Sequence, residues 1–198
     1  MKYKIYIVLL IFCSSCGLVA KKIYNIKKPK SEDATSVKSF LLKNKIDTTN
    51  VYIFRSAESF VKYSKLKTLT IPGAIFFNKA GNNIEYNKTA STCNKNITSF
   101  LDDLNSFSSK QTTDNFKIDD VLNLLNPISK GDKINDADIN VFILWTVYIG
   151  KLNDENTYEW IKLLNKAKAE GLKINFYLLN CDTQKDWDLE ISKVEIKK

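Results

Sequence analysis

The sequence predicts an α/β fold in which helices flank a central mixed sheet. Residues 140–146 (NVFILWT) and 174–179 (INFYLL) are apolar on both faces, which is typical of central strands covered by helices. Between them, residues 154–170 carry apolar side chains at helical spacing. The alternation of strand, helix and strand favours the α/β class.

The first elements of the chain also alternate in type. Residues 37–45 (VKSFLLKNK) place apolar side chains at helical spacing and predict a short amphipathic helix. Residues 51–54 predict an apolar strand, and residues 57–63 predict a short helix with Phe60 and Val61 facing inward.

A hairpin and a helix are predicted next. Residues 74–77 predict a strand, residues 78–82 a turn that contains Gly81, and residues 84–87 the return strand. Residues 96–107 have the i, i+3, i+4, i+7 apolar spacing of an amphipathic helix.

The following segment is more polar. Residues 106–115 (SFSSKQTTDN) are the best candidate for an internal linker. A short helix is predicted over residues 118–125, ahead of Pro127, and residues 131–138 predict a loop.

The longest predicted helix covers residues 154–170. Asn153 or Asp154 can cap its N-terminus, and Gly171 can end it. Its predicted buried stripe consists of Trp160, Leu163, Leu164 and Ala167. The chain closes with a polar tail, residues 186–198.

Residues 1–15 have the organisation of an export signal. Lys2 and Lys4 precede an apolar run from Ile5 to Phe12 that is too short to span a membrane. The sequence Ser-Ser-Cys ending at Cys16 resembles the lipobox of bacterial lipoproteins, in which this cysteine becomes the acylated first residue, with fatty acids such as palmitate. An ordinary secretory signal cut near Ser15 is the alternative.

Residues 16–35 are predicted to be a basic tether. They contain five lysines and no apolar pattern long enough to bury, which indicates a mostly unstructured spacer ahead of the folded part, residues 36–185. The lipobox resemblance implies a membrane as partner, through several acyl chains on Cys16. It also implies a bacterial cell-envelope location, facing the periplasm because nothing acidic directly follows Cys16, with inner and outer membrane both open.

The composition is that of one globular domain rather than a nucleic-acid-binding chain. Apolar residues make up 44% of the sequence, with only 6 glycines and 3 prolines. Loss of Lys2 and Lys4 with the signal lowers the formal charge from +8 to +6, and the tether holds five lysines. The body is therefore near neutral and its lysines are scattered, so no nucleic-acid partner is expected.

The chain contains no histidine. This removes the usual general base near neutral pH, the commonest zinc ligand and every Ser-His or Cys-His pair, so hydrolase and metalloenzyme classes lose support. The acidic segment 132–138 lacks the glycine and final glutamate of an EF-hand loop and is interpreted as a solvated loop. We expect no metal and no cofactor.

Two parts of the chain resemble the halves of a thioredoxin fold. In residues 70–108, Ile71-Pro72 precedes a strand, a glycine hairpin and a closing helix, as in the C-terminal half. In residues 138–182, a strand ending in Trp145 precedes a turn, a helix and a second strand, as in the N-terminal half. The resemblance therefore implies a thioredoxin-like sheet whose halves stand in rearranged order.

The halves can combine in two ways. In a single rearranged sheet, the strand at 139–146 lies between those at 74–77 and 174–179, with 51–54 at an edge. The alternative is two partial thioredoxin-like units. One interwoven domain is favoured, because neither half has enough strands to be stable alone.

The resemblance also places a candidate binding rim around the turn that follows Trp145. Ile149 and Leu152 fall where the family has its two redox cysteines, and Pro72 falls on its cis-proline. In redox relatives this rim docks extended polypeptide against the residue before that proline, here Ile71. The implied rim consists of Trp145, Tyr148, Ile149, Gly150, Ile71 and Pro72.

Sulfur chemistry at this turn is not expected. Dithiol exchange needs an activated thiolate and a resolving thiol, and Ile149 and Leu152 supply neither. Cys93 and Cys181 would lie at the same end of a thioredoxin-like sheet, where they are either a disulfide or redox pair or two small buried thiols.

The sequence thus predicts a membrane-anchored, redox-inactive thioredoxin-like lipoprotein that is more a binding module than an enzyme. Its expected partner is an envelope protein or peptide that docks on the rim. The alternative is an envelope thiol-disulfide protein that uses Cys93 and Cys181.

Overall fold

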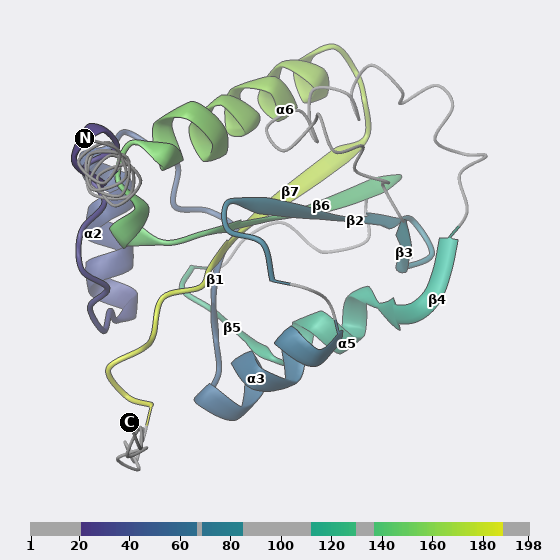
Figure 1. Ribbon diagram of the computed structural model, residues 1–198. Coiled ribbons are helices and arrows are strands. Elements are labelled where there is room, and N and C mark those ends of the chain that lie inside the picture. The colour runs from purple at the N-terminus through teal and green to yellow at the C-terminus, as the bar shows by residue number, and fades with distance from the viewer. Residues whose placement is uncertain (1–20, 67–68, 85–111, 130–136, 188–198) are drawn as a thin grey trace, which may run out of the picture.

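The computed structural model describes residues 21–66, 69–84, 112–129 and 137–187. The described strands form one curled, mixed, seven-stranded sheet (Figure 1). They are β1 (Val51–Phe54), β2 (Gly73–Asn78), β3 (Asn82–Ile84), β4 (Thr112–Lys117), β5 (Leu125–Pro127), β6 (Ile139–Trp145) and β7 (Ile174–Asn180). The helices around it are α2 (Ala34–Lys43), α3 (Ala57–Leu66), α5 (Ile118–Leu122) and α6 (Glu159–Ala169). The predicted α/β class, with helices flanking a mixed sheet, is confirmed.

The strand order is β4-β3-β2-β6-β7-β1-β5. β6 runs parallel to β7 and β7 parallel to β1, whereas the other neighbouring pairs are antiparallel. β6 therefore lies between β2 and β7, as predicted for a single rearranged sheet. The prediction that residues 51–54 form an edge is wrong, because β5 pairs with β1 on its outer side.

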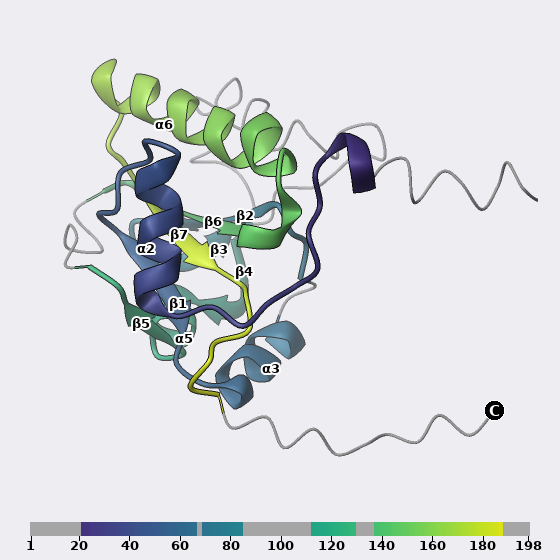
Figure 2. The same cartoon turned by 90° about the vertical axis from the view of Figure 1, so that its left-hand side faces the viewer.

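Helices cover both faces of this sheet. α2 and α6 pack on one face, and α3 and α5 pack on the other (Figures 1 and 2). Along β6, Val141, Ile143 and Trp145 belong to the core on the α2/α6 side, while Phe142 and Leu144 belong to the core on the opposite side. This alternation explains why the strand is apolar at successive positions: both of its faces are buried.

Residues 112–115 were predicted to be part of a linker, and this is wrong. They form the first part of β4, which pairs with β3. An outer strand is held by backbone hydrogen bonds to one neighbour, so its sequence need not carry an apolar pattern. The helix predicted over residues 118–125 ends at Leu122, and residues 125–127 form β5 instead. Pro127 fits there because β5 is at the edge of the sheet, where a missing N–H is tolerated.

The hairpin is confirmed, but its return strand β3 starts two residues earlier than the predicted 84–87. The Asn78 side chain accepts a 2.9 Å hydrogen bond from Asn82 N, and Gly81 adopts φ +79°, which closes the turn early.

In α3, Tyr63 is buried, whereas Val61 is 49% exposed instead of facing inward as predicted.

The helix predicted from residue 154 begins with a π-helical turn, Asn153–Tyr158, and becomes α-helical only at Glu159. Asn153 does not cap this helix; its buried side chain donates a 2.8 Å hydrogen bond to Thr146 O. The buried stripe includes Ile161 in place of Leu163.

Several predicted features lie outside the described residues. They are the signal and Cys16, residues 85–87 of the return strand, Cys93, the helix at 96–107, most of the loop at 131–138 and most of the tail at 186–198. No helix in the described part of the chain is long and apolar enough to span a bilayer.

Candidate functional site

The two segments predicted to form the rim lie together at one end of the sheet. β6 ends at Trp145 and leads into a 3-10 turn, Val147–Ile149. Gly73 of β2 pairs with Leu144 of β6, so Pro72 lies beside the end of β6. The Ile71-Pro72 peptide bond is cis, as the resemblance implied.

The members of the rim differ in exposure. Trp145 is fully buried and stacks on Phe40 of α2, with ring centroids 5.8 Å apart and an interplanar angle of 21°. Ile149 is also buried. Trp145 therefore supports the turn from inside the core and cannot contact a partner, because its strand position faces the α2/α6 layer. The partly exposed members are Tyr148, Gly150, Ile71 and Pro72.

A segment expected to be free of the domain lies across this turn. We call residues 24–33 the N-terminal strap; Figure 2 shows it in purple, running past the end of β7 to the start of α2. Lys27 N donates to Tyr148 O at 2.9 Å, and Lys151 N donates to Tyr24 O at 2.8 Å. Residues 16–35 were predicted to be a mostly unstructured spacer, but the strap is held against the domain, because these backbone groups pair with it.

The strap is attached a second time beyond β7. Glu32 N donates to Thr183 O at 2.8 Å, and Lys185 N donates to Glu32 O at 2.7 Å. The Lys185 ammonium also contacts the Asp33 carboxylate at 2.6 Å. Since these are mostly backbone hydrogen bonds, no side-chain pattern in the sequence indicated them.

Gly150 is required where the strap crosses the turn. It adopts φ +59°, a conformation that L side chains rarely adopt. A Cβ at this position would also lie 2.4 Å from both Tyr24 O and Asn25 O. Gly150 thus allows the strap to approach the backbone of the turn.

A buried polar cluster supports the turn from the β7 side. The Asp182 carboxylate accepts hydrogen bonds of 2.7 Å from Val147 N and from the Asn180 amide. Gln184 donates to Asp182 O at 2.8 Å and to the Asn180 side chain at 3.3 Å. This cluster was not predicted; its signal in the sequence is the polar run Asn180-Cys181-Asp182-Thr183-Gln184 directly after an apolar strand.

Burial raises the pKa of Asp182 to about 6, although the hydrogen bonds from Val147 N and Asn180 favour its charged form and oppose this shift. The nearby Glu32 carboxylate of the strap raises the pKa further. The cluster therefore joins the turn to the end of β7 through one weakly acidic group, which lies near the Glu32 carboxylate of the strap.

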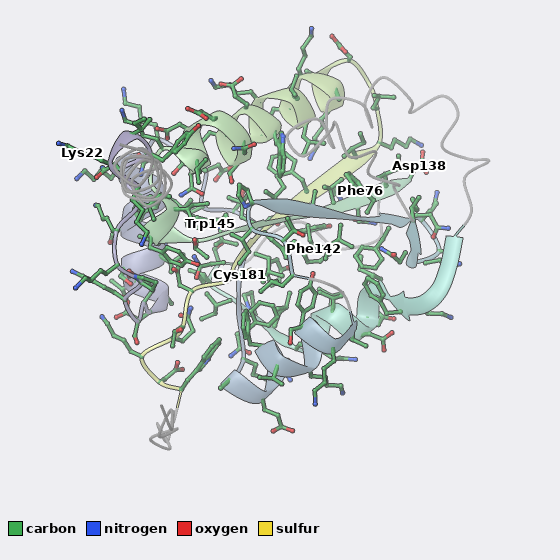
Figure 3. All side chains as sticks on the ribbon, viewed as in Figure 1. Lys22, Phe76, Asp138, Phe142, Trp145 and Cys181 are labelled. Atoms are coloured by element: carbon green, nitrogen blue, oxygen red, sulfur yellow. The ribbon has the colours of Figure 1, made fainter. Side chains whose placement is uncertain are left out.

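Cys181 lies next to the turn, but its thiol is buried and protonated. Its backbone N donates to Trp145 O at 2.8 Å, and its free thiol is only 6% exposed, on the side of the sheet opposite Trp145 (Figure 3). Burial, followed by the Asp182 carboxylate, raises the pKa of the thiol above its usual range. A thiol in this environment is a poor nucleophile.

Among the described residues, no group of three or more acidic or cysteine side chains could hold a metal ion.

No protein family model matches the chain, and neither a curated protein nor a solved structure matches it.

The raised pKa of Asp182 predicts a stability that falls as the pH rises. An aspartate has a pKa near 3.8 when unfolded, so between about pH 4 and pH 6 the folded state binds more protons than the unfolded state. We expect the unfolding free energy of the wild type, minus that of Asp182→Asn, to decrease by about 2–3 kcal/mol from about pH 4 to pH 7. Urea titrations across this range measure it. Asp33→Asn is the control, because the pKa of Asp33 is lowered and its contribution is constant over this range. A pH-independent difference for Asp182→Asn would contradict the assignment.

The burial of Cys181 predicts slow alkylation in the native protein. We expect iodoacetamide near neutral pH to modify Cys181 at least about 100-fold more slowly than in urea, because the thiol is inaccessible and protonated until the chain opens. Peptide mass spectrometry distinguishes Cys181 from the other cysteines, and Cys181→Ser identifies its peptide. Equal rates in the native and unfolded chains would show that the thiol is accessible.

Proposed function

We propose that this chain is a membrane-anchored, redox-inactive thioredoxin-like lipoprotein that binds an extended polypeptide of the cell envelope at the turn after β6. The binding surface consists of Tyr148, Gly150, Ile71 and Pro72. Trp145 and Ile149 hold this surface in place from the core.

The thioredoxin-like interpretation is supported by the positions of the elements in the sheet. The strand ending in Trp145 is central, and α6 connects it to its parallel neighbour β7. The strand that follows Ile71-Pro72 is its antiparallel neighbour on the other side. This is the arrangement that the two resembling segments require if they share one sheet in rearranged order.

The observation that carries the binding function is the strap on the turn. A segment without regular structure pairs its backbone with both Tyr148 and Lys151, and Gly150 leaves room for it. The turn can therefore receive polypeptide backbone from outside the sheet. Because these contacts are made by backbone groups, they place few demands on the sequence of the bound segment, and a partner that pairs with the same groups must displace the strap from Tyr148 O and Lys151 N.

The residues at the turn support the redox-inactive part of the proposal. Ile149 and Leu152 carry no sulfur, and Ile149 is packed in the core. The alternative function, a thiol-disulfide protein using Cys93 and Cys181, loses support because the Cys181 thiol is buried with a raised pKa.

Membrane anchoring rests on the sequence around Cys16. We expect Cys16→Ser to abolish incorporation of labelled palmitate and to release the protein from the membrane fraction, because the acceptor thiol is lost. Cys13→Leu, three residues upstream, is the matched control; it removes the other cysteine of the signal, supplies the aliphatic residue usual at this lipobox position, and should retain both the label and the membrane association. Label that persists in Cys16→Ser would exclude Cys16 as the acylated residue.

Docking at the rim predicts a site-specific crosslink. A photoreactive amino acid in place of Ile71 should give an adduct of discrete mass in cells that carry the anchored chain. Tyr148→Asp should reduce this adduct at least about 10-fold, because docking would then bury a charge. Tyr148→Phe keeps the ring and should retain the adduct.

The photoreactive residue at Val61, exposed on α3, serves as the position control. An Ile71 adduct that also forms at Val61, or that survives Tyr148→Asp unchanged, would reject the rim as the docking surface.

A further inference from the structure

The positive charge of the protein is concentrated on one short stretch of chain. Five lysines lie within residues 21–30, and no acidic residue occurs between Cys16 and Glu32. Since the chain from Cys16 onward has a formal charge of +6, these five lysines account for nearly all of it. We call them the basic surface, and its members are Lys21, Lys22, Lys27, Lys28 and Lys30.

The charges of the basic surface are not neutralised by the domain. All five side chains are exposed, and none of them forms an ion pair within the described part of the chain. By contrast, Lys185 beside the strap is paired with Asp33 at 2.6 Å. The basic surface is therefore available to a partner of opposite charge.

The backbone holds these lysines in a fixed arrangement. Ile26 N donates to Lys21 O at 2.9 Å, which closes the first turn of the described chain. Lys27 N donates to Tyr148 O at 2.9 Å, while the Lys27 side chain is exposed. Glu32 makes the second attachment of the strap. The domain thus binds the backbone of this stretch and leaves its ammonium groups outside, and such a preorganised array loses little entropy on binding.

An apolar side chain stands among the charges. Ile23 is 58% exposed, on the same helical turn as Lys21 and Lys22. Figure 2 shows this turn projecting beyond the sheet and its helices, and Figure 3 places Lys22 at the outer margin of the molecule. A partner that accepts both the lysines and Ile23 must carry anionic groups beside an apolar layer. An anionic lipid bilayer has this composition, whereas the phosphate backbone of a nucleic acid lacks the apolar layer.

We propose that the basic surface and Ile23 dock the protein on anionic phospholipid headgroups, with the turn after β6 at the bilayer surface. Each lysine near an anionic leaflet strengthens binding about fivefold, and removal of Ile23 from water adds to this. The inference rests on the proposed function only for the presence of a membrane, and it adds the lipid as a partner of the chain's own side chains.

Vesicle partitioning of the exported chain, residues 16–198, tests this docking. Cys16→Ser removes the acylation site, so binding by the basic surface is measured without the anchor. Vesicles of phosphatidylcholine are compared with vesicles of equimolar phosphatidylcholine and phosphatidylglycerol. We expect at least about 100-fold stronger binding to the anionic vesicles, falling at least about 10-fold between about 0.1 M and 1 M salt, where surface charges are screened.

Lysine variants identify the surface. Glutamine at all five positions of the basic surface should lower partitioning into anionic vesicles at least about 100-fold. A charge-matched control replaces five exposed lysines elsewhere and should stay within about threefold of the unsubstituted chain, because charges beyond a Debye length of the lipid are screened. The control positions are Lys62, Lys65, Lys79, Lys117 and Lys173. Both variants should unfold at the wild-type urea concentration, because exposed lysines contribute little to stability.

Ile23→Ser distinguishes a bilayer from other polyanions. It should lower partitioning into anionic vesicles at least about fivefold, because the apolar contact is lost. Val61→Ser on α3 is the matched control, since Val61 is 49% exposed, and should partition normally. Duplex DNA, titrated in parallel at the same salt concentration, should bind more weakly than the anionic vesicles.

Vesicles that carry a nitroxide on the headgroup test the orientation. A fluorescent amino acid in place of Ser31, exposed in the strap, should be quenched more strongly than one in place of Leu172. Leu172 is 39% exposed and precedes β7, at the end of the sheet opposite the turn. Equal quenching at the two positions overturns the proposed orientation.

The docking itself is overturned by equal binding to the two kinds of vesicle, by equal losses in the two lysine variants, or by unchanged partitioning of Ile23→Ser. Tighter binding of duplex DNA than of anionic vesicles overturns it as well. None of these results depends on acylation or on docking at the rim. The palmitate and crosslinking experiments test those separately, so a failure here is distinct from a failure of the proposed function.

Discussion

The structure depends on burying β6 on both faces. Every residue from Asn140 to Trp145 is at most 2% exposed, so helices must cover the sheet on both sides. Fully burying a large apolar side chain contributes about 1.5–3 kcal/mol, and this strand contributes several such side chains to each core. The end of β6 is therefore firmly held, and the turn that follows it starts from a fixed position.

Several neighbouring side chains and backbone groups make fixed contacts with the turn and with the end of β6. Trp145 packs into the α2/α6 core, Cys181 pairs its backbone with Trp145, and Asp182 accepts from Val147 N. Asn153, in the π-helical turn, donates a side-chain hydrogen bond to Thr146 O. The rim is thus built on one anchored connection between β6 and α6.

The sequence predicted best those elements whose side chains determine their structure. β6 and β7 have dense apolar patterns because they are buried on two faces, and both were predicted within a residue of their observed bounds. The polar strand β4 was missed because its pairing is made by backbone groups, which every residue possesses. The same reason explains the strap, whose attachment to Tyr148 and Thr183 is almost entirely backbone. The roles of Asp182 and Asn153 were missed because each side chain hydrogen-bonds a backbone group after β6, Val147 N or Thr146 O, and backbone groups leave no pattern in the sequence.

The strap also has a geometric consequence for the orientation of the protein. Eight residue steps separate Cys16 from Tyr24, whose carbonyl accepts from Lys151 N of the turn. Even fully extended, they reach at most about 29 Å. If Cys16 is acylated as proposed, the rim is held within about one bilayer thickness of the lipid headgroups. A polypeptide that docks there approaches along the membrane surface, so the local concentration of membrane-bound partners would govern occupancy more than their bulk concentration.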